Sequence, residues 1–592
     1  MGHPPLDAYQ AAAVQAAFAK RHHLHAPPRY QPAPALMVQH STAPPMADAS
    51  PSMSGSSLAE LLALPKPPLA VRALNNMSYG ATPETIGAFN ALGANDTARL
   101  TAYVDSQLAW ASIDDSAVES RLANAGYSTL AKTLPQLWAE HVRADPPYAT
   151  RMRPAWEIQR GAMVRAVYSQ RQLREVMTTF WHDHFNVTVS DFDAGPVYVH
   201  YDRDVIRQHA FGNFRQLLEA VTQSTAMMYY LDNRSNTRSG PNENFARELL
   251  ELHTLGAENY LGFTDPNQVP PSPLDPAYPA GYTDIDVYET AAAFTGWTVK
   301  NRHWQYPAED DGTFVYRAAW HDAGPKHVLG MYLGPEQPAL KDGRDILDRL
   351  ASHPGVARFV CRKLVRRFFA DRPSQELVDS AAAIFRANWQ HPDQIKLTLR
   401  HILLSSAAYN SWGAKNRRPF EAIAAALRVL GSDWTLRVEH AKSDEFMWRM
   451  GFTGHNAYDW PAPNGYPDTG VAWSGANSYA MTWKMLNWLS ETKDGEIPIA
   501  PILDITRRDV PVAQWTARRL VDYWCQRVLG YLPVESRYQA LVGFMAQNGD
   551  PSSYVIADTD AWKANDLKQH YNHQRLRSMV SLLLMSPEFL SR

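Results

Sequence analysis

The chain has 592 residues, of which 45% are hydrophobic and 20% are charged, and this balance is typical of a globular protein with a substantial core. Its length exceeds that of one ordinary domain. A formal net charge of -3 and a pI near 6.7 provide no basic field to neutralise phosphates, so we expect no nucleic-acid partner. No run approaches the length of about 18 consecutive apolar residues that a membrane-spanning helix requires, so we predict no membrane span.

The chain has two cysteines, Cys361 and Cys525, which are too few for a disulfide framework or a four-thiolate zinc site. Pairing with each other is one alternative, but Cys361 lies in a helical pattern, and we expect buried free thiols. Residues 1–5 lack the basic and apolar parts of a signal peptide. The sequence contains no phosphate-binding loop, no dinucleotide-binding glycine motif and no Gly-x-Ser-x-Gly elbow, which argues against nucleotide-dependent and serine-hydrolase chemistry.

Residues 1–56 are rich in Pro, Ala, Ser and His and cannot bury enough apolar surface to offset their chain entropy, which predicts a disordered tail. Residues 57–592 form the predicted folded body. Apolar residues recur there at helical spacing in one segment after another. The predicted helices span 58–64, 83–92, 97–108, 130–142, 156–167, 171–185, 214–231, 242–254, 284–297, 343–351, 356–369, 375–387, 395–404, 419–430, 479–489, 512–529, 538–547 and 574–584.

Two intervals of the body depart from the helical pattern. Residues 257–283 have a proline density that no helix or central strand accommodates, which predicts a long loop and a candidate lid over a site. In residues 298–333 hydrophobic and polar residues alternate, which predicts a β-hairpin or a small antiparallel sheet. The sequence therefore predicts a mainly α, multi-helical assembly with a small β insertion.

The segment 242–256 has the clearest helix signals of the chain, because a proline precedes it and a glycine ends it. On a helical wheel one arc carries only hydrogen-bonding side chains. This polar arc consists of Glu243, Asn244, Arg247, Glu248 and Glu251. We expect ion pairs from Arg247 to Glu243 and to Glu251. The arc is either a solvated face or the lining of a cleft that holds one carboxyl ionised and another protonated.

Two histidines lie in the predicted helix 171–185. On the helical wheel His184 shares the apolar face and His182 points to the opposite side, so we expect only His184 to face the core. A buried histidine is usually a hydrogen-bonded structural residue. The alternative is that the helix unwinds at Trp181, which would place both imidazoles on one face, as a metal site requires.

The turn 321–326, with the sequence His-Asp-Ala-Gly-Pro-Lys, follows a predicted strand, and we expect it to expose its side chains. A histidine beside an aspartate can serve as an oriented general base, which makes His321 and Asp322 catalytic candidates. Lys326 is a candidate to hold an anionic or carbonyl oxygen. The alternative is that aspartate and glycine are present for the conformation of the turn alone.

The proline-rich segment 460–468 contains Trp460 and Tyr466. Flat aromatic faces beside carboxylates are a common way to hold sugar rings, so these two residues are candidates for a carbohydrate platform. The alternative is a loop that caps the core.

Several of these segments resemble the motifs of one family. Residues 242–256, with the sequence NENFARELLELHTLG, resemble the central motif of a bacterial domain-of-unknown-function family, DUF1800. Further segments agree with that family in the expected order: 180–185, 282–283, 286–287, 295–297, 321–326, 329–330, 464–467 and 586–589. The resemblance implies a bacterial, often exported, mainly helical protein. We therefore expect a periplasmic or secreted protein whose leader is not part of this chain, with a cytoplasmic location as the alternative.

We expect the central segment, residues 181–185 and the turn 321–326 to meet in space, because polar groups in apolar surroundings are costly unless they satisfy one another. Three functions remain open. The first is a secreted or periplasmic enzyme that hydrolyses a glycan, with a polysaccharide as its ligand. Its catalytic candidates are Glu248, Glu251, His184, His321 and Asp322, and its substrate-binding candidates are Glu243, Asn244, Arg247, Lys326, Trp460 and Tyr466.

The second function is that of a metal-dependent enzyme. It would hold a divalent metal with His182 or His184 together with Glu248 and His321. The third is a non-catalytic envelope or assembly protein, whose motifs would be buried polar networks that keep helices in register.

Overall fold

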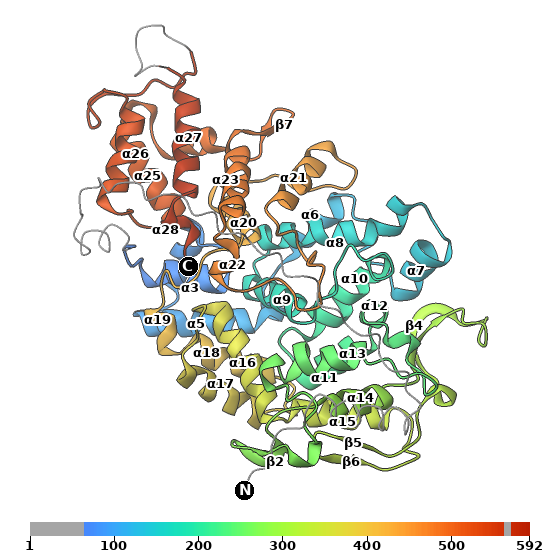
Figure 1. Ribbon diagram of the computed structural model, residues 1–592. Helices are drawn as coiled ribbons and strands as arrows, with labels where there is room; N and C mark the ends of the chain where they lie inside the picture. The colour runs from blue at the N-terminus through green and yellow to red at the C-terminus, as the bar shows by residue number, and fades with distance from the viewer. Residues whose placement is uncertain (1–63, 562–569) are drawn as a thin grey trace, which may run out of the picture. The chain divides into compact units, whose positions relative to one another are not determined.

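The computed structural model of the protein describes residues 64–561 and 570–592 (Figure 1). Nearly all of them belong to one compact unit, Lys66–Arg592. The predicted tail, residues 1–56, lies outside the described residues, and so does nearly all of the predicted helix 58–64.

The described chain is mainly α, as predicted, and its named strands form only short two-stranded antiparallel sheets. None of the helices in the described residues combines the length and the apolarity that a membrane span requires.

The described chain up to Tyr230 is helical. Its elements are α3 (Leu69–Met77), α4 (Pro83–Ala91), α5 (Asp96–Leu108), η1 (Trp110–Ser112), α6 (Ser116–Asn124), α7 (Leu134–Trp138), η2 (Ala139–Arg143), α8 (Tyr148–Tyr168), α9 (Gln172–His184), η3 (Gly195–Val197), α10 (Tyr198–His200), η4 (Tyr201–Arg207), α11 (Phe214–Gln223) and α12 (Thr225–Tyr230). Helices α3, α5 and α8 and the π-helical turn η4 all pack against α9. Most side chains of α9 are consequently buried.

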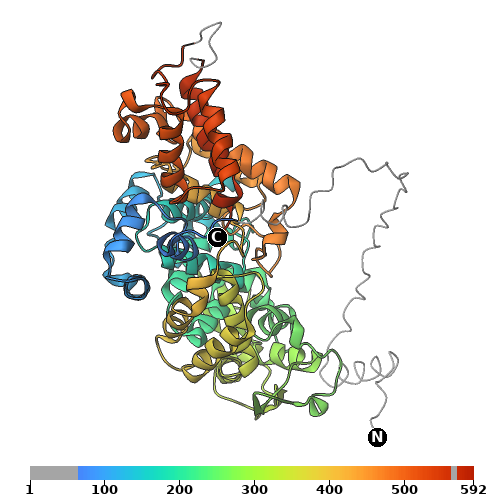
Figure 2. The ribbon, with the colours of Figure 1, turned by 90° about the vertical axis from the view of Figure 1, so that its left-hand side faces the viewer.

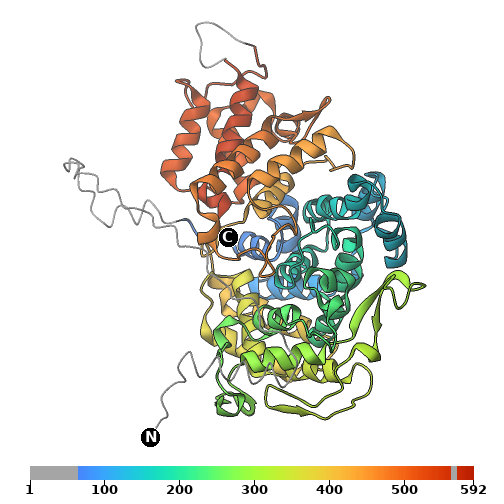
Figure 3. The same ribbon diagram turned by 45° about the vertical axis from the view of Figure 1, so that its right-hand side comes forward.

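The middle of the chain combines helices with hairpins. Its elements are η5 (Asn233–Ser235), α13 (Asn244–Glu248), η6 (Leu249–Thr254), η7 (Ala257–Asn259), η8 (Pro266–Gln268), β1 (Pro271–Ser272), β2 (Asp275–Pro279), α14 (Asp284–Ala293), β3 (Trp297–Asn301), β4 (Asp310–Tyr316), η9 (Ala318–Trp320), β5 (Lys326–Val328) and β6 (Met331–Leu333). Helix α14 packs between α13 and strand β5, and these elements lie together in both Figure 1 and Figure 3.

The remainder is again helical apart from one hairpin. Its elements are α15 (Lys341–Ala351), α16 (Pro354–Phe368), α17 (Gln375–Ala387), α18 (Gln394–Leu403), α19 (Ser406–Asn410), α20 (Pro419–Val429), α21 (Ala441–Phe452), α22 (Gly470–Trp473), α23 (Ala476–Glu491), β7 (Lys493–Asp494), β8 (Ile497–Pro498), α24 (Ile502–Asp509), η10 (Val512–Gln514), α25 (Ala517–Leu529), α26 (Glu535–Ala546), α27 (Asn572–Leu584) and α28 (Pro587–Leu590). Helices α25, α26 and α27 pack on one another, and they stay together in both Figure 1 and Figure 2.

The predicted β insertion is present as two hairpins. Strand β3 pairs with β4, where Trp297 lies opposite Tyr316, and β5 pairs with β6. The proline-rich interval 257–283 is not only the long loop that we predicted, because β1 and β2 form a third hairpin within it. Proline tolerates such two-stranded pairing, where only one side of each strand needs its donors.

Some segments that we predicted as one continuous helix are interrupted in the structure. The predicted helix 214–231 is interrupted at Ser224, whose side chain accepts a hydrogen bond from the backbone N–H of Met227 and thereby caps α12. The prediction of buried free thiols is confirmed, since Cys361 and Cys525 are both buried and unpaired.

Candidate functional site

The central segment is helical, but it is not one regular α-helix. An α-helical part, α13, gives way to a π-helical part, η6, in which the backbone N–H of Leu255 donates to the carbonyl of Leu250 at 2.9 Å, five residues back. The prediction of a continuous α-helix is therefore wrong after Glu248. Short π-helical turns are rare and occur frequently at functional sites.

The change of helix type alters the partners of Arg247. The predicted pair with Glu243 is present at 3.1 Å. The second partner is not Glu251 but Asp284 of α14, also at 3.1 Å. Residues after Leu249 follow the wider π register, so Glu251 leaves the i,i+4 position that an α-helix would give it.

The carboxylates of Glu248 and Glu251 are thereby left without hydrogen-bond or ion-pair partners among the described residues. Both side chains are half-buried. Burial, followed by the negative charge of Glu251, raises the pKa of Glu248 to about 7. A carboxyl group with such a pKa is protonated much of the time at neutral pH, while its neighbour supplies negative charge.

Tyrosines surround this carboxyl pair. Tyr282 is fully buried, and its hydroxyl has no hydrogen-bond partner among the described residues. Burial, and then the charge of Glu251, raises its pKa, so the phenol remains a neutral donor. Burial raises the pKa of Tyr230 to about 12, and the charge of Glu248 contributes to this rise. The hydroxyl of Tyr230 donates to the carbonyl of Pro461 at 2.8 Å. The carboxyl pair is thus linked to the loop that follows Trp460.

The C-terminal part of the central segment contacts residues 180–185, which we call the histidine motif. Nε2 of His184 lies 3.0 Å from the carbonyl oxygen of His253. Both imidazoles are buried, and neither ring nitrogen of His253 has a partner among the described residues. Burial and the nearby Lys363 ammonium lower the pKa of His253 to about 3, so the ring is neutral.

The histidine motif and the loop 464–468 together form a cavity of about 170 Å³, which we call the motif pocket. Its lining residues are Phe180, Asp183, Lys363, Arg366, Arg367, Asn464, Tyr466, Pro467 and Asp468. Gly465 makes the close approach possible: its φ is +70°, and a Cβ atom there would lie 1.9 Å from the carbonyl oxygen of Asp183.

Buried charges surround the motif pocket. Arg418 donates to Asp183 at 2.6 Å and to Glu421 at 3.0 Å, and Arg367 also donates to Glu421. Burial raises the pKa of Asp183 even though Arg418 opposes it, and burial lowers the pKa of Lys363 to about 8. The pocket therefore combines a carboxyl and an ammonium group, and in both of them burial favours the uncharged form.

His182 occupies a separate buried network. Its Nε2 lies 2.9 Å from Asp202, and Arg207 joins Asp202 to Glu175 at 2.7 and 2.8 Å. The prediction that only His184 faces the core was wrong, because η4 and the ring of Tyr458 cover the other side of α9 and bury His182 as well.

The turn 321–326 exposes Ala323 and Pro325, as we predicted, but it buries the two candidates His321 and Lys326. Asp342 of α15 lies 3.2 Å from Nε2 of His321 and accepts from the ammonium of Lys326 at 2.9 Å, and His321 and Lys326 are both buried. Asp322 is half-exposed, and its side chain accepts from the backbone N–H of Gly324. The ionic partner thus comes from a helix that the sequence did not connect to this turn.

The aromatic loop is also more enclosed than a carbohydrate platform requires. Tyr466 is 6% exposed and lies in the wall of the motif pocket, with its ring centroid 4.4 Å from that of His455. Trp460 is half-buried, and its indole N–H donates to Asn464 at 2.8 Å. Asn244 is exposed at the start of α13.

The structure brings only part of the predicted site together. His184 and the central segment are in contact, whereas His321 bonds to Thr295 and Asp342. Among the described residues no hydrogen bond or ion pair joins His321 to Glu248. Likewise, no group of three or more His, Cys, Asp or Glu side chains in the described part of the chain is arranged to hold a metal ion.

Sequence reasoning missed several residues of the site. Lys363, inside α16, and Asp468, shortly before α22, carry no local signal, because charged residues are ordinary at such positions. Tyr282 and Asp183 could have been singled out, since both lie within the family motifs but were assigned no role. The signal was therefore the position within a motif rather than the residue type.

The chain belongs to a family of proteins of unknown function, DUF1800, whose model matches residues 72–591. Neither a curated protein nor a solved structure matches the chain.

Proposed function

We propose that the protein is an enzyme that hydrolyses a glycan, with Glu248 and Glu251 as its acid and base. The observation that carries this proposal is the pair of half-buried carboxyl groups without hydrogen-bond partners among the described residues, one of which has its pKa raised to about 7. In a protein whose other buried charges are extensively paired, such a pair is costly to maintain unless it acts on a ligand.

The assignment of roles follows from the electrostatics. Glu248 is the proton donor to the glycosidic oxygen, because its pKa keeps it protonated near neutral pH. Glu251, three residues later, is the base that activates water or the nucleophile that attacks the sugar. The charge of Glu251 acts on Glu248 and raises its pKa, so the two carboxyl groups are near each other, as the acid and base of a glycosidase must be, at about 5–10 Å.

Neighbouring groups suit a polyhydroxylated substrate. The hydroxyl of Tyr282 is buried and has no partner among the described residues, so it would pair with a sugar hydroxyl that enters the site. Arg247 is held by Glu243 and Asp284, and its positive charge opposes the rise of the Glu248 pKa. Arg247 therefore limits the pKa of Glu248 without forming an ion pair with it.

A non-catalytic role in assembly is the second candidate, and the buried networks of His182 and His321 favour it. Each network pairs its own carboxylates with basic side chains, as structural polar clusters do. This role does not account for the unpaired Glu248 and Glu251, so we rank it below the enzyme.

The test is a screen of purified protein against a panel of polysaccharides, followed by single variants on the active substrate. Glu248→Gln and Glu251→Gln should each lower kcat by about a hundredfold or more. Glu258→Gln is the matched control, because Glu258 is exposed and pairs with Arg362 on the surface. Hydrolysis that survives both central substitutions would refute the proposal.

A further inference from the structure

A second cavity lies away from the central segment, between α8 and α21 with the loop that precedes α21. Its volume is about 470 Å³, within the roughly 300–1,000 Å³ of small-molecule sites. Its lining residues are Ala149, Thr150, Arg153, Trp156, Gln159, Arg160, Val438, Glu439, Asp444, Met447 and Asn456. None of them belongs to the motif pocket or to the carboxyl pair, so this cavity is a separate feature of the fold.

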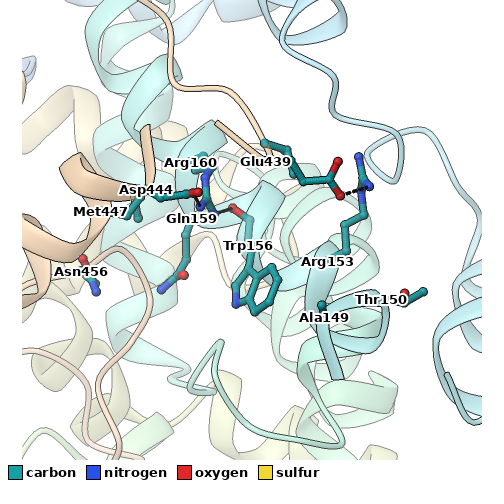
Figure 4. Close-up of a pocket in the computed structure, with 11 residues that line it drawn as sticks. Ala149, Thr150, Arg153, Trp156, Gln159, Arg160, Glu439, Asp444, Met447 and Asn456 are labelled. Carbon is teal, nitrogen blue, oxygen red and sulfur yellow. Dashed lines mark hydrogen bonds and ion pairs between the residues drawn. The ribbon is translucent and has the colours of Figure 1, made fainter. Parts of the chain in front are cut away.

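An indole forms one wall of this cavity. Figure 4 shows the ring of Trp156 between Gln159 and Arg153, and the side chain is half-buried. The ring of Tyr148 meets it edge-on with the centroids 6.1 Å apart, which restricts its orientation. A flat ring that is held in place and partly open to solvent suits stacking against the apolar C–H face of a sugar.

Two buried polar atoms of the lining have no hydrogen-bond partner among the described residues. They are Nε of Arg160, a residue 8% exposed, and Oδ1 of Asn456. One is a donor and the other is an acceptor. A hydroxyl group both donates and accepts, so a ligand rich in hydroxyl groups suits both of these lining side chains.

The charges of the cavity cancel in pairs. Arg160 binds Asp444 at 2.6 Å, and Arg153 binds Glu439 at 3.1 Å, as the dashed lines in Figure 4 show. A phosphate or a uronic acid would have to compete with these carboxylates for the guanidinium groups. The arrangement therefore disfavours an anionic ligand and favours a neutral one.

From the aromatic wall, the two unpartnered atoms and the cancelled charges, we infer that this cavity binds a neutral saccharide ring. The inference does not depend on the chemistry assigned to Glu248 and Glu251, because a binding module with no catalytic activity would carry the same cavity. If both proposals hold, the cavity anchors the same glycan at a distance from the reacting bond.

The experiment is calorimetric titration of the full chain with short oligosaccharides of glucose, xylose and mannose, and with oligogalacturonate as the charged comparison. Ala149→Trp fills the rim of the cavity from an exposed position on α8 and should weaken binding by about tenfold or more. Ala144→Trp, at an exposed residue outside the cavity, should leave affinity unchanged. Trp156→Ala should also weaken binding, with folding checked by circular dichroism.

Binding of at least one neutral oligosaccharide that Ala149→Trp weakens and Ala144→Trp does not would support the inference. It would be overturned if no neutral oligosaccharide binds, if oligogalacturonate alone binds, or if Ala149→Trp binds as tightly as the unsubstituted protein. A loss of hydrolysis without a loss of binding would concern the proposed function only, so the two proposals fail separately.

Discussion

Replacing Glu248 by glutamine should stabilise the protein at high pH and have little effect at low pH. The folded protein raises the pKa of Glu248 from its usual 4.5 to about 7, mainly by burial. An acid with a raised folded-state pKa ionises more readily when the chain unfolds. The free energy of unfolding therefore falls as pH rises from about 4.5 to about 7, and the loss persists above that range. Glutamine cannot ionise, so the variant escapes this loss.

The size of the effect follows from the shift. Each pKa unit corresponds to about 1.4 kcal/mol, so complete ionisation of Glu248 in the folded state costs at most about 3 kcal/mol. Because the carboxyl group is only half-buried, solvent reduces this cost, and we expect a gain of about 1–2 kcal/mol for the variant at pH 8.

Urea unfolding at about pH 5 and about pH 8 measures this gain, with Glu258→Gln as the exposed control that should change stability by less than about 0.5 kcal/mol at both values. A gain of equal size at both pH values, or a loss at pH 8, would refute the assignment of Glu248 as a carboxyl group whose environment keeps it protonated.

Arg247→Ala should cost about 2–3 kcal/mol because it removes the ion pair of the buried Asp284. The cost should be larger at about pH 8 than at pH 5, because the charge of Arg247 also opposes the rise of the Glu248 pKa. An equal, small deficit in thermal melts at both pH values would contradict this. Gly465→Ala should lower the free energy of unfolding by at least about 3 kcal/mol in chemical denaturation. Gly454→Ala, at a glycine with open space around it, should lower it by about 1 kcal/mol. Equal losses would show that the close approach of Gly465 to Asp183 does not require glycine. His253→Phe should be more stable relative to the unsubstituted protein at pH 5 than at pH 8, by about 1–2 kcal/mol. A histidine whose folded-state pKa is about 3 makes the protein less stable as pH falls below about 6.5, and phenylalanine does not. No such gain at acidic pH would show that the ring is protonated in the folded protein.

Much of the helical scaffold was predictable, because amphipathic periodicity and caps are local properties of the sequence. Helix α17 begins and ends at the predicted residues, 375–387. Helix α14 begins where a capping box between Thr283 and Asp286 marks its start. The burial of Phe245 and Leu249 and the partial exposure of Glu248 also follow the predicted faces of the central segment.

The site was less predictable, because its properties arise between segments. No residue of 242–256 marks the change from α to π geometry, which removes Glu251 from Arg247. His182 is buried by η4, and a helical wheel of α9 does not show which other segments pack against the helix. The partner of His321 and Lys326, Asp342, likewise comes from another helix.

The hydroxyl of Tyr282 allows the structural and the ligand-binding roles of the carboxyl site to be separated. A buried hydroxyl that has no partner in the described part of the chain costs stability, so Tyr282→Phe should raise the free energy of unfolding by about 1 kcal/mol or more if the group is reserved for a ligand. The same substitution should raise KM on the substrate found in the polysaccharide screen, since the substrate loses that donor. Tyr260→Phe is the matched control, because its hydroxyl donates to Asp284 at 2.8 Å and its removal should lower stability. If Tyr282→Phe lowers stability as Tyr260→Phe does, the Tyr282 hydroxyl has a structural partner within the fold, and it is not a binding group of the site.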